Sequence, residues 1–316
     1  MDKLIERETA PRNSLAAVPA LAVQFFLIPL AVVGVTVLAY VSFRSLLTTR
    51  RTPQDYLNEI RYGGSNRQWP AAYELSRLMD EPGVRADRSL GPALVKAFEE
   101  TKNDDPRVRR YLTLAIGRLD PPLPANAVMV LANSLEDPER HWTPDWFSRM
   151  NGWSDVDINE ARISTIWALG SSGDPSAVAR LLPLYDSADA GIRKIVVYAL
   201  GALPGDAQIV TLSTALQDSA PDVRWNAAVA LARHRRHDGV PVLRQMLDRS
   251  YVEQAVTRTV RQDEDRDPIA EVMIGGLRAL ASLKARSVRS AVEILSQQDR
   301  SLKVRQAAFE ALKEIG

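Results

Sequence analysis

The chain has 316 residues, no cysteine, and 40 basic against 39 acidic side chains, which leaves a formal net charge of +1. The absence of cysteine excludes disulfide bridges, thiolate metal sites and thiol nucleophiles. The near-neutral charge argues against a general nucleic-acid binder, because such proteins usually carry a large basic excess. No nucleic-acid partner is therefore expected.

The first distinctive segment lies near the N-terminus. Between Arg12 and Arg44 there are 31 residues without a charged side chain, and residues 18–43 are rich in Leu, Val, Ala and Phe. About 20 apolar residues are enough for a helix to cross a bilayer. We expect a tail over residues 1–14 and a transmembrane anchor helix over residues 15–43, which makes the lipid bilayer one partner. A cleaved signal peptide is the alternative, but its apolar core is usually only about 7–15 residues long.

Lysine and arginine residues flank the expected anchor on both sides. Lys3, Arg7 and Arg12 precede it, and the residues that follow it are Arg44, Arg50, Arg51 and Arg61. Because the cytoplasmic flank of a membrane helix carries the larger number of such residues, the count favours a single-pass membrane protein whose large domain is cytoplasmic.

A short juxtamembrane helix and linker are predicted within residues 44–64. Thr52 and Pro53 offer an N-cap followed by proline at the first helical position. Leu57 and Ile60 belong to the apolar side of this helix, and two glycines end it at residues 63–64. We expect this helix to pack on the first part of the main domain.

One phrase recurs about seven times between Gln68 and the C-terminus. Each clear copy has an apolar residue and an arginine, then small or apolar residues, and a leucine seven positions after the arginine, as in Arg193 and Leu200. The interval from Arg162 to Arg193 is 31 residues, and the interval from Arg193 to Arg224 is the same. Such a period indicates a stacked repeat, whose units need neighbours to bury their apolar faces. The residues at the arginine position are Gln68, Arg109, Arg162, Arg193, Arg224, Met273 and Arg305.

The spacing within each copy is helical. From Ile163 to Gly170, the small and apolar residues fall at i, i+3, i+4 and i+7, which is one stripe of a helix. A turn with Gly, Pro or Asp follows, and a second apolar helix then begins, for example over residues 177–185. Residues 65–316 are therefore expected to be all-α and to form an α-solenoid of about seven helix pairs.

Two segments carry a resemblance to a known family. Asp105-Pro106-Arg107-Val108-Arg109 and Gly173-Asp174-Pro175-Ser176-Ala177-Val178 resemble the short HEAT repeats of phycobilisome-lyase-like proteins. The resemblance covers residues 65–316 and implies a right-handed solenoid. With its expected anchor, the chain resembles a membrane-anchored, bacterial-style member of this family. The resemblance also implies that the repeated arginines are structural, because the family's arginine usually pairs with an aspartate of a turn.

The iron-binding branch of the HEAT proteins uses His-Glu pairs. No histidine of this chain is followed by glutamate, so the sequence predicts no metal ligands.

The first interval longer than 31 residues runs from Arg109 to Arg162. It has 53 residues and places an insertion near residues 138–158, which holds three of the chain's six tryptophans. Tryptophan is over-represented among the residues that dominate protein interfaces. We therefore take four aromatic residues as candidates for partner binding: Trp142, Trp146, Phe147 and Trp153. The alternative is that they cover the flank of the solenoid.

The second long interval runs from Arg224 to Met273 and has 49 residues, with an insertion near residues 249–268. Ser250 and Glu253 have the spacing of a capping box, which predicts an extra amphipathic helix. Both insertions occur between a second helix and the next first helix. Since such junctions lie along one edge of a solenoid, the insertions could flank one binding surface.

A basic turn is expected over residues 233–237, where other repeats have small residues. Arg235 and Arg236 are further candidate partner-binding residues, since a positive turn suits an acidic partner or lipid headgroups. A solvated turn without a partner is the alternative.

Motifs for catalysis are missing from the sequence. It contains no phosphate-binding glycine loop, no serine nucleophile elbow and no His-x-x-x-His. We therefore expect no enzyme, with no catalytic, cofactor-binding or metal-binding residues. The predicted function is that of a membrane-anchored HEAT-repeat scaffold or adaptor, which binds a membrane protein or a membrane-associated complex. The alternative is a cofactor- or chromophore-handling protein of lyase-like or chaperone-like type.

Overall fold

The computed structural model describes residues 28–47, 51–101, 105–136, 153–256 and 267–316. Within these ranges the regular structure is entirely helical, which confirms the all-α prediction. The chain divides into two compact units, Met1–Thr52 and Pro53–Gly316.

The first unit contains helix α2 (Ile28–Leu47). The described ranges hold no helix that combines the length and the hydropathy needed to cross a membrane. The transmembrane helix expected over residues 15–43 is therefore not found there, and residues 15–27 lie outside the described ranges. The uncharged part of α2 ends before Arg44. At 1.5 Å per residue it is about 24 Å long, shorter than the hydrocarbon core of roughly 30 Å.

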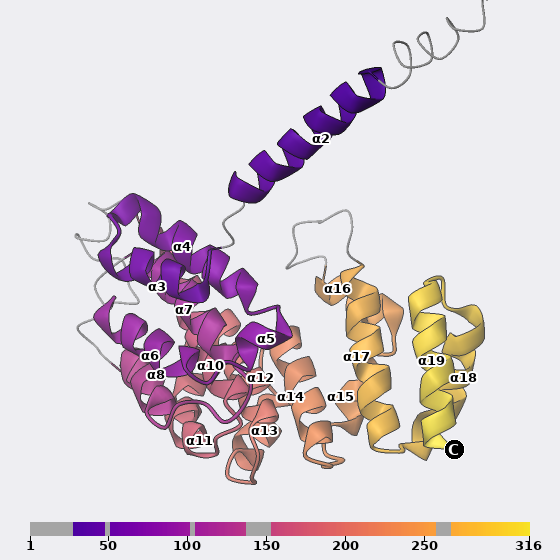
Figure 1. The fold of residues 1–316 in the computed structure, drawn as a ribbon. Coiled ribbons are helices and arrows are strands. Elements are labelled where there is room, and N and C mark those ends of the chain that lie inside the picture. The colour runs from indigo at the N-terminus through magenta and orange to yellow at the C-terminus, as the bar shows by residue number, and fades with distance from the viewer. Residues whose placement is uncertain (1–27, 48–50, 102–104, 137–152, 257–266) are drawn as a thin grey trace, which may run out of the picture. The chain divides into compact units, whose positions relative to one another are not determined.

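The second unit is a succession of helix pairs (Figure 1). The first helices carry the repeated frame and are α4 (Ser65–Leu78), α7 (Pro106–Gly117), α10 (Asp155–Ser171), α12 (Ala190–Ala202), α14 (Pro221–Arg233), α17 (Pro268–Ser282) and α19 (Leu302–Ile315). The second helices are α6 (Leu90–Glu100), α8 (Ala127–Glu136), α11 (Ser176–Leu181) with the 3₁₀ helix η3 (Leu182–Asp186), α13 (Ile209–Ala215), α15 (Val240–Gln245) and α18 (Arg289–Gln298). Further helical segments are α3 (Pro53–Tyr62), α5 (Pro82–Arg85), α16 (Arg249–Val256) and η4 (Arg286–Val288).

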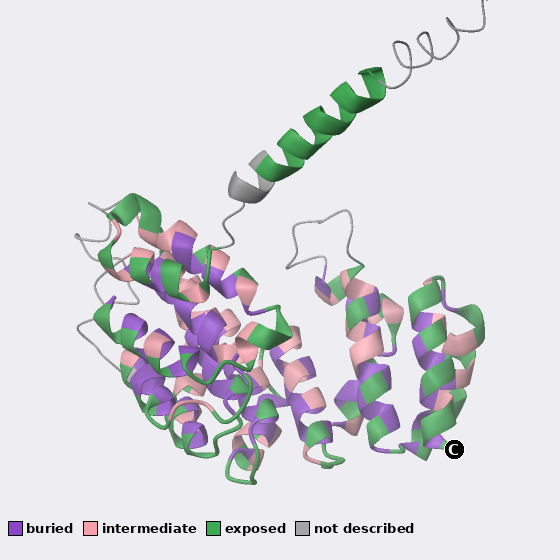
Figure 2. Cartoon of the chain, in the orientation of Figure 1, coloured by how far each residue is buried: buried purple, intermediate pink, exposed green. Residues whose placement is uncertain are grey.

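The repeat frame gives the core of the second unit. The apolar residue seven positions after each frame residue is fully buried in six copies: Leu75, Ile116, Leu169, Leu200, Leu231 and Leu280. Figure 2 shows the buried residues gathered where the helices face one another. Helix α3 joins this core through Leu57 and Ile60, and Gln68 donates a hydrogen bond to the Ile60 carbonyl at 3.1 Å.

Small residues set the spacing of successive first helices. Gly170 of α10 faces Ala199 of α12, and a Cβ added to Gly170 would lie 2.6 Å from the Ala199 Cα. Gly201 of α12 faces Ala230 of α14 in the same way. A side chain at either glycine would force the two helix backbones apart, so these glycines allow close stacking.

This glycine series stops at α14. The residue that corresponds to Gly201 is Ala232, and α14 and α17 pack less closely than α12 and α14. Instead, Gly276 of α17 faces Met246 at the end of α15, where an added Cβ would lie 3.0 Å from the Met246 Cβ. The exposed faces of α14 and α17 leave a hollow that residues of both helices line.

The two insertions take different forms. In the first, α10 begins at Asp155 within the predicted insertion, and Ser154 and Asp157 form its capping box. Residues 137–152 lie outside the described ranges. In the second, α16 is the extra helix, but its cap is not Ser250. The Asp248 carboxylate accepts hydrogen bonds from the backbone amides of Ser250 and Tyr251 at 3.0 and 3.2 Å. The Asp248 carboxylate therefore caps α16 in place of the predicted Ser250.

Two of the repeated arginines, Arg193 and Arg224, bind the turns between neighbouring repeats. Arg193 binds both carboxylate oxygens of Asp218, at 2.8 and 2.9 Å, and also donates to the carbonyls of Ser187 and Ala188. The pair is almost enclosed, since the Asp218 side chain is 5% exposed. Hydrogen bonds from Arg193 lower the pKa of Asp218 to about 2. At this repeat, the arginine–aspartate pair implied by the resemblance is present.

Arg224 uses different acceptors. It donates to the carbonyls of Asp218 and Ser219, at 2.6 and 3.1 Å, and to the hydroxyl of Tyr251 in α16 at 3.0 Å. The second insertion is therefore tied to the repeat that precedes it.

Candidate partner-binding groove

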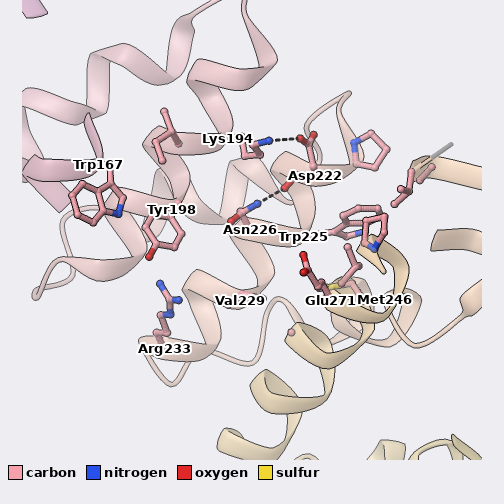
Figure 3. A pocket seen from close by; sticks show the side chains of 17 residues that line it. Trp167, Lys194, Tyr198, Asp222, Trp225, Asn226, Val229, Arg233, Met246 and Glu271 are labelled. Carbon is pink, nitrogen blue, oxygen red and sulfur yellow. Dashed lines mark hydrogen bonds and ion pairs between the residues drawn. The ribbon is translucent and has the colours of Figure 1, made fainter. Parts of the chain in front are cut away.

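A groove with a volume of about 640 Å³ crosses the first helices α10, α12, α14 and α17 (Figure 3). The C-terminal end of α16 closes one side through Ala255 and Val256. The groove therefore occupies the region where the glycine series stops and the second insertion begins.

The repeat frame places one row of groove residues. Trp167, Tyr198 and Val229 each follow their frame arginine by five positions, and all three line the groove. Equivalent positions of parallel stacked helices lie side by side. Two aromatic rings and a valine therefore form a continuous, half-buried apolar strip along three successive repeats.

Trp225 forms the apolar wall nearer α17. Its side chain is 6% exposed, and its ring meets the edge of Tyr251 of α16 at a centroid distance of 6.4 Å. Its indole N–H is buried and donates no hydrogen bond to any described residue. A buried donor without an acceptor is costly. The indole N–H of Trp225 is therefore an unsatisfied polar group within this wall.

The middle of the groove is electrostatically neutralised. Lys194 and Asp222 form an ion pair at 3.2 Å, and the Asn226 amide donates to the Asp222 carbonyl at 2.7 Å. These polar groups satisfy one another across α12 and α14, as the dashed lines of Figure 3 show.

Two other charged residues line the groove outside this neutral centre. The Arg233 guanidinium lies over the Tyr198 ring, 5.3 Å from its centroid. Glu271 lies at the other side of the view in Figure 3, with Trp225 and Met246. Neither Arg233 nor Glu271 forms an ion pair with a described residue. Within the described lining, one positive and one negative group are thus without an ion-pair partner.

The predicted partner-binding residues that the structure describes, Trp153, Arg235 and Arg236, do not line this groove. Trp142, Trp146 and Phe147 lie outside the described ranges, and Trp153 is half-buried and engaged in contacts. Arg235 and Arg236 occupy the turn after α14, as expected.

The basic turn is only partly free. Arg235 is exposed and has a left-handed backbone conformation with φ of 56°. Arg236 donates to the Asp206 carboxylate at 3.3 Å, so it is partly engaged within the chain. Arg233, the last residue of α14, is the one that reaches the groove.

The sequence prediction missed the groove residues on the helices themselves. The available signal was the position five residues after each frame arginine, which carries Trp167 and Tyr198 and lies outside the buried stripe. Large aromatic residues on two successive repeats at an outward position indicate a surface that can be covered.

In the described ranges, no three His, Cys, Asp or Glu side chains lie close enough together to hold a metal ion.

Comparisons with known proteins agree with the repeat architecture. A family model described as a PBS lyase HEAT-like repeat matches residues 161–187, which include most of α10 together with α11 and η3. No curated protein matches the chain. The matched repeat and the stacked helix pairs together indicate a protein of HEAT-repeat type.

Two solved structures are similar to the chain. One is an engineered protein from the Northeast Structural Genomics Consortium, with 18% identity, a TM-score of 0.36, and coverage of 83% of this chain and 96% of that one. The other is human deoxyhypusine hydroxylase in complex with glycerol, with 18% identity, a TM-score of 0.33, and coverage of 83% and 95%. At these values the likeness carries no argument about function.

Proposed function

We propose that this protein is a non-catalytic scaffold or adaptor, which binds a protein partner in the groove across α10, α12, α14 and α17. The observation that carries the proposal is the gathering of Trp167, Tyr198 and Trp225 along one open groove. Aromatic residues supply much of the binding energy at protein interfaces, where charged groups usually form the rim. The groove has this arrangement, with Arg233 and Glu271 beside the apolar strip.

A binding role also suits the polar groups in the centre of the groove. Within the described lining, Lys194 and Asp222 are paired with each other. Neither side chain is therefore available as an acid or a base for a substrate.

We further propose that residues 15–43 attach the protein to a membrane, so that the partner is a membrane protein or a membrane-associated complex. Every residue from Ile28 to Ser42 is exposed, and nearly all of them are apolar. The Thr36 hydroxyl donates to the Val32 carbonyl at 2.7 Å, which satisfies this polar group within the helix. An exposed helix that is apolar on all sides is typical of burial in lipid or protein.

The membrane proposal is tested by fractionation. The full chain should remain in the membrane pellet after alkaline carbonate extraction, and a chain lacking residues 1–52 should move to the supernatant. Release of the full chain by carbonate would contradict the anchor without affecting the groove.

Partner binding is tested by quantitative affinity purification of the full chain from detergent-solubilised membranes. A stoichiometric partner should be recovered, and Tyr198→Glu should reduce its recovery at least tenfold, because it places a charge in the apolar strip. Val210→Glu is the matched control, since Val210 is 76% exposed and lies on α13, away from the groove lining. Recovery of this chain alone, or equal recovery by both variants, would refute the proposal.

A cofactor- or chromophore-handling role is the second candidate. The match to a PBS lyase HEAT-like repeat supports it, and the groove's volume lies within the usual range of about 300–1,000 Å³ for small-ligand sites. A visible absorbance band that copurifies with the wild-type protein and is lost in Tyr198→Glu would favour this candidate over the scaffold.

A further inference from the structure

Building on the proposed function, we infer that the groove holds an extended peptide segment of the partner. This segment carries an acidic side chain for Arg233 and a basic side chain for Glu271, with an apolar side chain between them. Charge complementarity with the groove identifies the occupant.

The acidic group is specified by Arg233. Its guanidinium stacks on Tyr198 at 5.3 Å, which holds it at the groove while its N–H groups form no ion pair with a described residue. A planar guanidinium prefers the two oxygens of a carboxylate, which it can bind through paired hydrogen bonds. A carboxylate of the peptide is therefore the complementary group.

The basic group is specified by Glu271, an exposed carboxylate on the first turn of α17 without an ion-pair partner in the described ranges. Nearby, Asp222 is already neutralised by Lys194 at 3.2 Å. Glu271 thus remains as the uncompensated negative charge of the lining, and a lysine or arginine of the peptide is its complement.

The repeat frame gives the separation of these two contacts. Arg233 follows Arg224 by nine positions, whereas Glu271 precedes Met273 by two. With about 1.5 Å per residue along each helix and about 10 Å between neighbouring helices, the two backbone positions lie on the order of 20 Å apart. An extended chain covers this distance in about six residues.

The same dimensions favour an extended segment over a helix. A helix rises only about 1.5 Å per residue and would need about 13 residues to span the same ~20 Å, roughly twice as many as an extended chain needs.

The inference is tested by selecting random dodecapeptides displayed on phage against the immobilised full chain in mild detergent. Enriched peptides should carry Asp or Glu about six positions from Lys or Arg, with an apolar residue between. In Arg233→Glu the acidic position should switch to Lys or Arg, and in Glu271→Lys the basic position should switch to Asp or Glu.

Matched controls separate the groove from general surface charge. Arg235→Glu reverses an exposed arginine two positions after Arg233, and Glu310→Lys reverses an exposed glutamate on α19; neither residue lines the groove. Both controls should select the wild-type pattern. In fluorescence anisotropy, Arg233→Glu should weaken the best wild-type peptide at least tenfold, and exchange of the peptide's acidic residue for lysine should restore binding. Arg233→Gln provides a milder variant if the reversal lowers the melting temperature.

The outcomes also distinguish this inference from the proposed function. Selected peptides without the charge pattern, or equal effects of Arg233→Glu and Arg235→Glu, would overturn the inference. If Tyr198→Glu still abolished partner recovery in that case, the scaffold function would stand with a different occupant. Selected peptides that adopt a helix when bound, seen by circular dichroism, would likewise overturn the extended segment.

Discussion

Arg249 and Asp299 form the same two-hydrogen-bond ion pair as Arg193 and Asp218, although Arg249 does not belong to the repeat frame. Its guanidinium contacts the two carboxylate oxygens of Asp299 at 3.0 and 2.6 Å. Asp299 precedes Arg305 by six positions, as Asp218 precedes Arg224. The frame residue that would supply the guanidinium is Met273, so the inserted helix α16 supplies it instead.

Replacement of Arg249 should therefore destabilise the C-terminal repeats. The two side chains are only 15% and 3% exposed, and Arg249→Met leaves the Asp299 carboxylate buried without its cation. Breaking a buried pair on one side costs about 3–5 kcal/mol, and urea unfolding should show a loss of this size. Arg289→Met is the control, because Arg289 forms an exposed pair with Glu293 and should cost under about 1 kcal/mol. Equal effects of the two variants would contradict the role of α16.

The Arg193–Asp218 pair should make stability depend on acid pH. The pKa of Asp218 is lowered to about 2 by Arg193, whereas an unfolded aspartate titrates near 3.9. Its contribution, on the order of 2 kcal/mol, is fully present above the unfolded pKa and is lost as pH falls from about 4 to 2. The difference in unfolding free energy between wild type and Asp218→Asn should shrink between pH 5 and pH 3. A constant difference over this range would show that the charge is irrelevant.

The glycine series should be intolerant of a methyl group where two helices touch. Gly201→Ala brings a Cβ against Ala230, and overpacking of this kind costs about 1–3 kcal/mol. Gly275→Ala is the matched change in α17, where the nearest atom to an added Cβ is the Met246 Cε at 3.9 Å. There the better helix propensity of alanine should leave the melting temperature unchanged or raised. Similar losses in both variants would refute the stacking argument.

The repeat frame itself is tested by a buried charge. Leu231 is fully buried, so Leu231→Asp should cost several kcal/mol and remove most of a typical total stability of about 5–15 kcal/mol. Val210→Asp introduces the same charge at a position that is 76% exposed and should leave the cooperative thermal transition intact. Survival of Leu231→Asp with an unchanged transition would mean that the frame is misplaced.

The candidate role of the Trp-rich insertion is tested separately from the groove. Replacement of Trp142, Trp146 and Trp153 by alanine should abolish partner recovery without a change in melting temperature if these residues bind the partner. If they cover the solenoid instead, the melting temperature should fall, because Trp→Ala in a core costs about 3–5 kcal/mol.

The helical repeat was predictable because its signal is repeated. Each copy places an apolar residue at the same distance from the frame position, and chance variation in one copy, such as Met273 for arginine, does not hide the period. The burial of Leu280 seven residues later shows that the apolar pattern continues without the arginine. Local periodicity and burial agree along the unit, which is the condition under which sequence patterns are most reliable.

The groove was not predictable by the same means. It depends on the separation of α14 and α17, and thus on contacts between residues far apart in the sequence, such as Met246 with Gly276. The substitution of Ala232 for the repeated glycine is visible in the sequence, but its effect appears only when the neighbouring helix is placed. Arg249 was missed for a related reason, because its partner Asp299 lies 50 residues away.

The pairing of Arg249 with Asp299 also limits how the length of this chain can vary. Removing residues 249–266 would shorten the interval from Arg224 to Met273 to the common 31-residue period, and by sequence alignment this would look like the repair of an irregular repeat. It would also remove Arg249, whose guanidinium pairs with Asp299, and Tyr251, whose hydroxyl accepts a hydrogen bond from Arg224. Helix α16 therefore compensates for Met273, and a chain shortened in this way would need an arginine at position 273 to pair with Asp299.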